Sequence, residues 1–286
     1  MTDRRLGLLL IAPSVALLAG VALYPIVSTL WLSLHRSILV FHEHRFVGFE
    51  NWSFLIGDGR FWSALGTTAY FAAVAVFFEL LLGLGFALLL HGAFRGRGLM
   101  RAAVLVPWAI PTVVAARLWA WLFNPDHGLV AALLPGQDVN WLGTPGFALH
   151  AAIVVDVWKT TPFVALILLA GLQSIPADVT RAAQLDGAGP GRILWSITLP
   201  MLRPAIAVAA VFRGLDAMRV FDAVYVLTGG GPANTTETLS IYAYKTLMRS
   251  GDFGYGSTLA VATFCCVAVF AAISLRLVMP RDGARE

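Results

Sequence analysis

Six long runs of predominantly apolar residues divide this chain. They cover about residues 6–34, 61–90, 102–123, 146–171, 204–227 and 256–275. Each reaches the roughly 20 residues that a helix needs to cross the hydrocarbon core of a bilayer. The chain is 58% apolar and only 13% charged, about half the charged fraction of a soluble domain. We therefore predict an all-α, polytopic membrane protein in which residues 1–286 form a single transmembrane domain of six helices.

The Lys and Arg residues of the connections predict the orientation, because cytoplasmic loops carry an excess of them. With the N-terminus inside, eleven cationic residues fall on the inner side and five on the outer side. The inner set is Arg4, Arg5, Arg95, Arg97, Arg101, Arg181, Arg192, Arg203, Arg276, Arg281 and Arg285. The outer set is Arg36, Arg45, Arg60, Lys245 and Arg249. We expect both termini to be cytoplasmic, and we read the net charge of +4 as an orientation signal rather than as a nucleic-acid signal.

Prolines and small residues inside the spans indicate more than a lipid anchor. Prolines occur in or near the ends of four spans, at Pro13, Pro25, Pro107, Pro111, Pro162 and Pro204. A proline removes a backbone hydrogen bond, which is tolerated in a membrane where protein or a water-filled cavity satisfies the freed group. Small residues such as Gly83 and Gly85 allow helices to approach closely. The pattern favours a packed bundle around a cavity.

A polar, glycine-punctuated insert, residues 173–200, separates the fourth and fifth spans. Pro176 suits the first turn of a helix, and Asp178 complements the helix dipole there. Gly187, Gly189 and Pro190 are expected to end the helix after about ten residues. An ordinary amphipathic helix on the bilayer surface is one interpretation. Because the small residues in its middle form a weak apolar face, we favour docking of a soluble partner.

The same insert resembles the coupling-loop motif of ATP-binding-cassette (ABC) importer permeases. The motif is carried by Leu172-Gln173-Ser174-Ile175-Pro176, Ala182-Ala183, Asp186-Gly187-Ala188 and Ile197-Thr198-Leu199-Pro200. Further similarity lies in Val106-Pro107-Trp108-Ala109-Ile110-Pro111, Trp121-Leu122-Phe123-Asn124-Pro125 and Val226-Leu227-Thr228-Gly229-Gly230-Gly231-Pro232. Together these stretches are similar to the carbohydrate-uptake branch, which includes the maltose, trehalose and glycerol-phosphate permeases.

The resemblance implies a multi-pass protein of the bacterial cytoplasmic membrane with several partners. These are a second permease, two copies of an ATPase, an extracytoplasmic sugar-binding (lipo)protein and a sugar. Contact with the ATPase is expected from Arg181, Ala182, Ala183, Asp186, Gly187 and Ala188. The chain departs from the family at one position, because Arg181 stands where a glutamate is usual. Contact with the binding protein is expected at Gly229, Gly230, Gly231 and Pro232, for which a helix stop followed by a turn is an equal alternative.

Charged residues inside the spans are costly in hydrocarbon and normally face a cavity, a partner or one another. They are Glu79, Arg117, Asp156, Lys159, Arg213, Asp216, Arg219 and Asp222. One interpretation is structural pairing at i,i+3, of Asp156 with Lys159 and of Arg219 with Asp216 or Asp222. Interhelical or intersubunit pairing is expected for Glu79 and Arg117. The other interpretation is a sugar path, and similarity to the maltose permease implies as its contacts Asp156, Thr160, Phe163, Arg213, Asp216, Ala217 and Val220.

The sequence contains no strong motif for nucleotide binding, catalysis or metal binding. There is no phosphate-binding Gly-x-x-x-x-Gly-Lys-Ser/Thr motif, so we expect ATP and Mg²⁺ on partner subunits and no cofactor in this chain. No catalytic constellation stands out. His42 and His44 lack a third ligand at metal-site spacing, and the adjacent Cys265 and Cys266 are read as small packing residues.

The leading hypothesis is therefore a non-enzymatic permease subunit of an ATP-driven sugar importer that works by alternating access. Trehalose or maltose are the leading cargo candidates, with a glycerol-phosphate diester as a third. The alternative is an ion-coupled secondary transporter that uses Asp156, Lys159 or Asp216, although six spans are few for that and no inverted repeat is visible. An intramembrane enzyme is disfavoured by the lack of a catalytic constellation.

Overall fold

Helices of membrane-spanning length dominate the computed structural model, which describes residues 3–92, 94–133 and 139–278. Within these ranges, five helices and one sharply bent helix pair are long and apolar enough to cross a membrane. The single spans are Leu9–Ser33, Gly59–His91 (α4), Phe147–Gln173 (α8), Pro190–Ala217 and Phe253–Arg276. If the bent pair is one span, the six predicted spans are present. The orientation stays a prediction, and Arg281 and Arg285 lie outside the described residues.

The first and fifth spans each join several helical elements. The first consists of α1 (Asp3–Leu18), a π-helical turn (Ala19–Leu23) and α2 (Tyr24–Ser33). The fifth consists of α10 (Pro190–Ile193), a π-helical turn (Leu194–Thr198) and α11 (Leu199–Ala217). The last span lies in α14 (Phe253–Val278).

The third predicted span is not a straight helix. It is divided into α5 (Arg97–Ala109) and α6 (Thr112–Leu122), which meet at an angle of 93°. The cause is local, because Pro111 has no backbone N–H and the residue before a proline is biased towards extended backbone. Ile110 accordingly has φ −72° and ψ 133°.

The fifth predicted span, 204–227, is wrong as one continuous helix. The apolar helix begins earlier, at Pro190, and α11 ends at Ala217. After a break at residues 218–221 the chain continues in α12 (Asp222–Leu227). The Thr238 hydroxyl, 3.1 Å from the Val220 carbonyl oxygen, satisfies that group within the break. Thr238 is 18 residues from Val220 in the sequence. The pattern of apolar residues within the span therefore could not predict this contact or the break that it stabilises.

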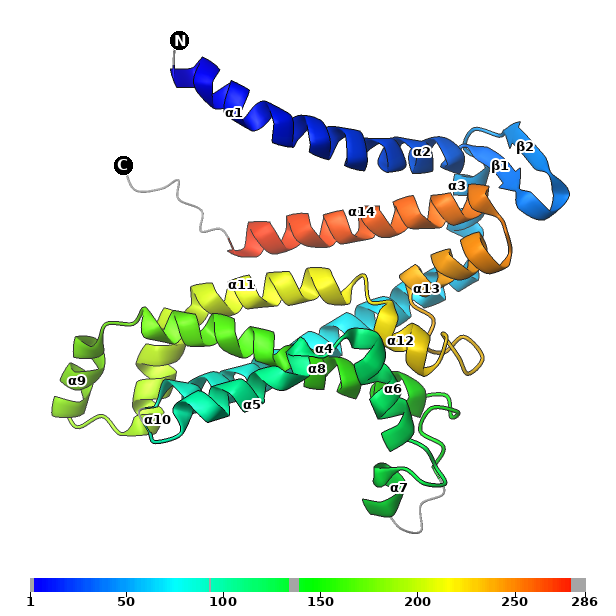
Figure 1. Cartoon of the computed structure of the whole chain (residues 1–286). Helices are drawn as coiled ribbons and strands as arrows, with labels where there is room; N and C mark the ends of the chain where they lie inside the picture. The colour runs from blue at the N-terminus through cyan, green and yellow to red at the C-terminus, as the bar shows by residue number, and fades with distance from the viewer. Residues whose placement is uncertain (1–2, 93, 134–138, 279–286) are drawn as a thin grey trace. The chain divides into compact units, whose positions relative to one another are not determined.

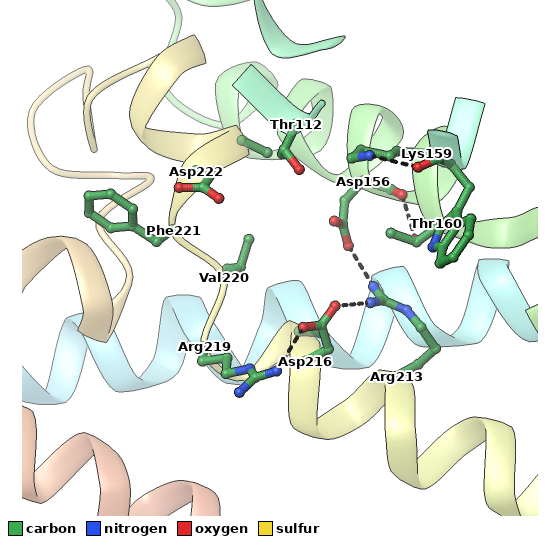
Figure 2. Close-up of a pocket in the computed structure, with 13 residues that line it drawn as sticks. Thr112, Asp156, Lys159, Thr160, Arg213, Asp216, Arg219, Val220, Phe221 and Asp222 are labelled. Carbon is green, nitrogen blue, oxygen red and sulfur yellow. Dashed lines mark hydrogen bonds and ion pairs between the residues drawn. The ribbon is translucent and has the colours of Figure 1, made fainter. Parts of the chain in front are cut away.

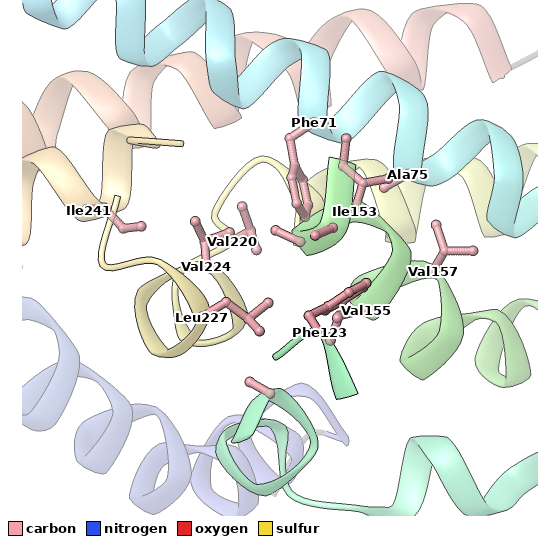
Figure 3. Packing of buried hydrophobic residues seen from close by; sticks show 13 residues of the cluster. Phe71, Ala75, Phe123, Ile153, Val155, Val157, Val220, Val224, Leu227 and Ile241 are labelled. Carbon is pink, nitrogen blue, oxygen red and sulfur yellow. The ribbon is translucent and has the colours of Figure 1, made fainter. Parts of the chain in front are cut away.

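The chain folds as two compact units, and the larger one comprises residues 64–241 with 267–286. In it, α8 packs against α5, α6, α11 and α12. One buried core in it joins Phe71 of α4, Ile153 and Val155 of α8, and Val224 of α12 (Figure 3). These side chains are packed without access to lipid or water, so α8 has a fixed position among its neighbours. A five-residue helix, α7 (Leu129–Leu133), follows α6.

The smaller unit, residues 1–63 with 242–266, contains a β-hairpin that the all-α prediction did not include. Strand β1 (His35–Ile38) pairs with β2 (Glu43–Phe46) in antiparallel register, and the 3₁₀ turn Leu39–Phe41 lies between them. The hairpin is followed by α3 (Glu50–Gly57). Two short elements precede the last span in the sequence. They are α13 (Leu239–Tyr244), whose residues are divided between the two units, and a π-helical turn (Lys245–Arg249).

The insert between the fourth and fifth spans contains a short helix, as predicted. Helix α9 (Ala177–Leu185) has nine residues and joins the end of α8 to the start of α10 (Figure 1). Pro176 is its N-cap, and Asp178 lies in its first turn. Gly187 has φ +80°, a conformation that glycine adopts without strain. The Ala188 N–H donates to the Ala183 carbonyl, which closes the helix end.

Candidate functional site

A polar cavity of about 380 Å³ opens in the larger unit where the two broken helices meet α8 (Figure 2). The lining comes from the α5–α6 bend, the middle of α8, the end of α11 and the α11–α12 break. Its residues are Trp108, Thr112, Asp156, Lys159, Thr160, Arg213, Asp216, Ala217, Arg219, Val220, Phe221, Asp222 and Ala223. Interrupted helices are a recurring feature of binding sites in transporters, because their free ends present polar groups inside the membrane.

Arg213 is at the centre of the polar cluster. Its Nε lies 2.6 Å from Glu79 Oε2, and its Nη2 lies 2.8 Å from Glu79 Oε1 and 3.0 Å from Asp156 Oδ2. Its Nη1 donates to Asp216 Oδ2. One guanidinium therefore connects carboxylates from α4, α8 and α11. Such pairing offsets the cost of removing these charges from water.

The two polar residues that follow Asp156 on α8 have different partners. The Thr160 hydroxyl lies 2.6 Å from Glu79 Oε1 and 2.6 Å from the Asp156 carbonyl oxygen. Lys159 Nζ donates to the Ile110 carbonyl at 2.6 Å and lies 3.4 Å from that of Trp108. Both carbonyls are at the α5–α6 bend, so Lys159 supplies a donor where the helical hydrogen bonds stop.

Six of the seven predicted sugar contacts lie together around this cavity. They are Asp156, Thr160, Arg213, Asp216, Ala217 and Val220. Val220, expected on the face of a continuous helix, lies instead in the α11–α12 break. Phe163 is not among the lining residues. Its ring stacks on Trp108, with ring centroids 6.2 Å apart and planes inclined by 18°, so it supports a wall residue.

The predicted charge pairs have mixed outcomes. Arg219 pairs with Asp216 at 3.4 Å as expected, and the interhelical pairing predicted for Glu79 is confirmed by its bond to Arg213. The expected pair of Asp156 with Lys159 is wrong, because among the described residues Asp156 pairs with Arg213 and Lys159 with carbonyls. Arg117 is exposed on α6, and no ion pair joins it to the described part of this chain.

Sequence reasoning missed Trp108 and Thr112, which line the cavity from the α5–α6 bend. Pro107 and Pro111 were the available signal, because a break at these prolines turns neighbouring side chains towards a cavity. Phe221 and Asp222 line the cavity from the other break. Asp222 was expected only as a charge within or near a span, and Phe221 was not predicted to contribute.

The cavity offers groups that suit hydroxyl-rich ligands. Carboxylates accept hydrogen bonds from hydroxyls, and the half-exposed Asp216 and the exposed Asp222 are available to a ligand. The aromatic rings of Trp108 and Phe221 add apolar surface. A few directed polar groups beside apolar walls are the usual composition of a small-molecule site.

The residues predicted to contact an ATPase lie on or just after α9. Arg181, Ala182, Asp186 and Gly187 are exposed, and Ala183 and Ala188 are half-buried. Arg181 Nη1 lies 3.4 Å from Asp178 Oδ1 on the same helix face. Leu185, which was not singled out, has 89% of its surface exposed. It is the most exposed of the large apolar side chains of α9.

The Gly229–Pro232 segment is buried or half-buried in this chain. Gly230 is buried, and Gly229, Gly231 and Pro232 are half-buried. The Thr236 hydroxyl donates to the Gly231 carbonyl at 2.7 Å, which fixes the turn from inside. The exposed tip of this loop is formed by Ala233 and Asn234, both with positive φ.

Comparison with known proteins identifies the family. The family described as "Binding-protein-dependent transport system inner membrane component" matches residues 79–281. The chain is 43% identical to the trehalose/maltose transport system permease protein MalF of Thermococcus litoralis, covering 96% of this chain and 94% of that protein. It is 45% identical to the trehalose transport system permease protein SugA of Mycobacterium tuberculosis, covering 97% and 90%.

The fold is also that of a solved transporter. A chain of the bacterial alginate ABC transporter, crystallised with an alginate pentasaccharide-bound periplasmic protein, superimposes with a TM-score of 0.83. The match covers 95% of this chain and 93% of that chain at 20% identity, so it bears on the fold alone. The family match spans more than half of the sequence and includes α9 and the cavity. This chain therefore belongs to the family of binding-protein-dependent transport system inner membrane components.

Proposed function

We propose that this chain is the permease subunit of an ABC sugar importer and that the cavity around Arg213 is part of its translocation path. The observation that carries the proposal is the cluster of Glu79, Asp156, Asp216 and Arg213 at the junction of two broken helices. A purely structural ion pair could be fully enclosed. Here Asp216 is half-exposed and reaches the cavity, where it can accept a hydrogen bond from cargo.

The proposed cargo is a disaccharide, with trehalose or maltose as the leading candidates. The names of the relatives from Thermococcus litoralis and Mycobacterium tuberculosis support this class. The composition of the cavity supports it too, because carboxylates beside aromatic rings match the polar edges and apolar faces of sugar rings. A glycerol-phosphate diester is less well supported, since Arg213 and Lys159 already have their hydrogen bonds inside the protein.

Import is proposed to use partners that this chain does not supply. A second permease completes the path, and two copies of an ATPase bind ATP and Mg²⁺. Helix α9 docks on an ATPase subunit at the cytoplasmic side, so both termini are cytoplasmic in the bacterial membrane. An extracytoplasmic binding protein delivers the sugar, and we place its contact at Gly229–Pro232 together with Ala233 and Asn234.

Uptake by the reconstituted importer tests the role of the cavity. The chain, its companion permease, the ATPase and the binding protein are assembled in proteoliposomes, and uptake of labelled trehalose and maltose is measured. We expect Asp216→Asn and Thr160→Val to lower uptake, because the first removes a carboxylate charge and the second a hydroxyl group at the cavity. Asp126→Asn, at an exposed loop position, is the matched control and keeps wild-type uptake. Normal uptake by both cavity variants would contradict the assignment.

The same vesicles test the energy source. We expect uptake to require ATP on the side of the ATPase. Uptake that is driven by a pH gradient without ATP would support the alternative, an ion-coupled secondary transporter.

A further inference from the structure

The base and the tip of the β-hairpin both contact the ends of membrane-spanning helices in the smaller unit. The base contacts α2, and the tip contacts the residues just before α14. Its first residue, His35, is separated from the end of α2 by Leu34 alone, and the Asn51 side chain bonds to the Ser33 and His35 carbonyls at 3.0 Å. At the other end, the Leu39 N–H donates to the Gly251 carbonyl at 2.9 Å, two residues before α14 begins. Ile38 also forms a β-bridge with Asp252. A hairpin attached in this way lies across the ends of the spans.

The span ends themselves are adjacent. The Thr258 hydroxyl of α14 lies 3.2 Å from the Ser33 carbonyl at the end of α2. Both helices pass the length and hydropathy requirements for a membrane span, so their adjacent ends are at one surface of the bilayer. The hairpin is therefore at the depth of the headgroups on that side.

The register gives the hairpin two different faces. His35 pairs with Phe46 and Ser37 with His44, so these four side chains share one face. The opposite face carries Arg36, Ile38, Glu43 and Arg45. On that face Glu43 pairs with Arg36 at 3.1 Å and with Arg45 at 3.4 Å, and both arginines stay about half-exposed. One face thus carries three aromatic rings, two of them from histidines, and the other carries two arginines, an arrangement that suits a segment lying in a membrane interface.

The aromatic face continues the exposed apolar surface of the first span. The Trp31 ring on α2 is exposed, and its centroid lies 6.4 Å from that of Phe46, which is also exposed. His35 packs between them, with its ring 4.7 Å from Trp31 and 5.2 Å from Phe46. Tryptophan at the end of a span marks the boundary between acyl chains and headgroups. Phe46 is thus placed at the same boundary.

The tip of the hairpin exposes three consecutive large apolar residues. Leu39, Val40 and Phe41 have 63%, 70% and 74% of their surfaces exposed. In water such a run costs free energy in proportion to its apolar area. In the interface the side chains enter the acyl boundary, while arginine side chains reach lipid phosphates.

We propose that the hairpin of residues 35–46 is a membrane-surface element whose partner is the bilayer itself. Leu39, Val40 and Phe41 insert at the headgroup–acyl boundary, and Arg36 and Arg45 contact phosphate groups. The continuity through Trp31 and Phe46 favours lipid over a soluble protein as the occupant of this surface. The proposal does not depend on which side of the membrane the hairpin occupies or on the cargo.

Spin-label accessibility tests this placement. Cys265 and Cys266 are replaced by Ala, and single cysteines are introduced as Val40→Cys and, separately, Phe41→Cys. The complete importer is reconstituted in vesicles of phosphatidylcholine and phosphatidylglycerol, and each label is probed with oxygen and with a water-soluble nickel chelate. Val21→Cys, exposed in the first span, is the lipid control, and Asn234→Cys, at an exposed loop tip, is the water control.

We expect the labels at 40 and 41 to be more accessible to oxygen than to the nickel chelate, as at Val21. Nickel accessibility equal to that at Asn234 would overturn the proposal. A label that becomes inaccessible to both reagents only when liganded binding protein is added would also overturn it, because it would identify a protein-docking surface. Because both positions are exposed, neither change disturbs the core, and two variants guard against a local folding defect at one of them.

Discussion

Glu79 and Arg213 lie 134 residues apart in the sequence and form a two-pronged ion pair, Nε to Oε2 at 2.6 Å and Nη2 to Oε1 at 2.8 Å. Glu79 is completely buried. A bidentate pair of this kind fixes the relative orientation of its two side chains as well as neutralising both charges. It therefore ties α4 to α11 beside the cavity.

Removing Glu79 is expected to destabilise the protein less than removing both Glu79 and Arg213. Glu79→Gln leaves Arg213 with one fewer buried counter-charge, and we expect a loss of about 3 kcal/mol in the free energy of unfolding. The double variant Glu79→Gln/Arg213→Gln is expected to be less stable still, because it leaves Asp156 and Asp216 without their shared cation. Thermal unfolding in nanodiscs measures both. A double variant at least as stable as Glu79→Gln alone would contradict this account.

Replacing Gly83 by alanine is expected to lower the stability of the protein, whereas the same replacement at Gly85 is not. A Cβ at Gly83 would lie 2.6 Å from Val164 Cγ1 and 2.9 Å from its Cβ, whereas nothing lies within 4 Å of one at Gly85. We expect Gly83→Ala to lower stability by about 1–3 kcal/mol through overpacking of α4 against α8. Gly85→Ala is the matched control and is expected to be neutral or slightly stabilising, since alanine favours helix. Equal melting temperatures for the two variants would refute the close contact.

Leu185 is expected to matter for coupling rather than for folding. Leu185→Asp puts a charge on the most prominent apolar side chain of α9, and its exposure predicts little effect on stability. We expect cargo-stimulated ATP hydrolysis by the reconstituted importer to fall at least about tenfold, equivalent to about 1.4 kcal/mol of docking free energy. Leu185→Met keeps the apolar contact and serves as the control. Full stimulation in the Asp variant would remove Leu185 from the docking surface.

Asp58 is expected to make part of the stability depend on pH. Burial would raise its pKa, but hydrogen bonds from Tyr242, Tyr255 and the backbone N–H of Arg60 outweigh burial, and the net pKa is lowered. A carboxyl group with a lowered pKa stabilises the fold above its ordinary value of about 3.9 and loses this contribution as the pH falls through the lowered value. The Tyr242 hydroxyl remains a donor throughout, because burial and Asp58 raise its pKa to about 12.

Tyr242→Phe tests that contribution. Near neutral pH we expect it to lower the free energy of unfolding by roughly 1 kcal/mol, the usual net value of one hydrogen bond. The difference from wild type should shrink in acid, where Asp58 is protonated, and in an Asp58→Asn background. Chemical unfolding at both pH values measures it. A difference that grew in acid would have the wrong sign for this mechanism.

The spans and the insert could be predicted because their signals are local. An apolar run long enough to cross a bilayer is visible in any window, and the proline before α9 and the glycines after it determine its bounds. The break after Ala217 is not local in this sense. It depends on a loop hydroxyl, Thr238, that reaches Val220 only in the folded chain. The β-hairpin was missed for a similar reason, since its four-residue strands are short and are fixed by contacts with α2 and residues 251–252.

The candidate site was predictable in composition but not in connectivity. Intramembrane charges are rare enough that Asp156, Arg213 and Asp216 stand out in the sequence. Spacing along one helix suggested Asp156 with Lys159, yet the partners come from different helices. Sequence separation carries no information about which of several buried carboxylates an arginine reaches. The order of the helices around α8 decides it.

Lys159 adds a polar link between two helices that also pack against each other. Its ammonium group, carried by α8, takes the carbonyl oxygen of Ile110 at the end of α5, beside Trp108. The other end of α8 leads within a few residues into α9. A displacement applied at α9 and transmitted along α8 would therefore move the tryptophan side of the cavity with it, through this bond and through the stacking of Phe163 on Trp108. The Trp108 side of the cavity and helix α8 are thus expected to move together.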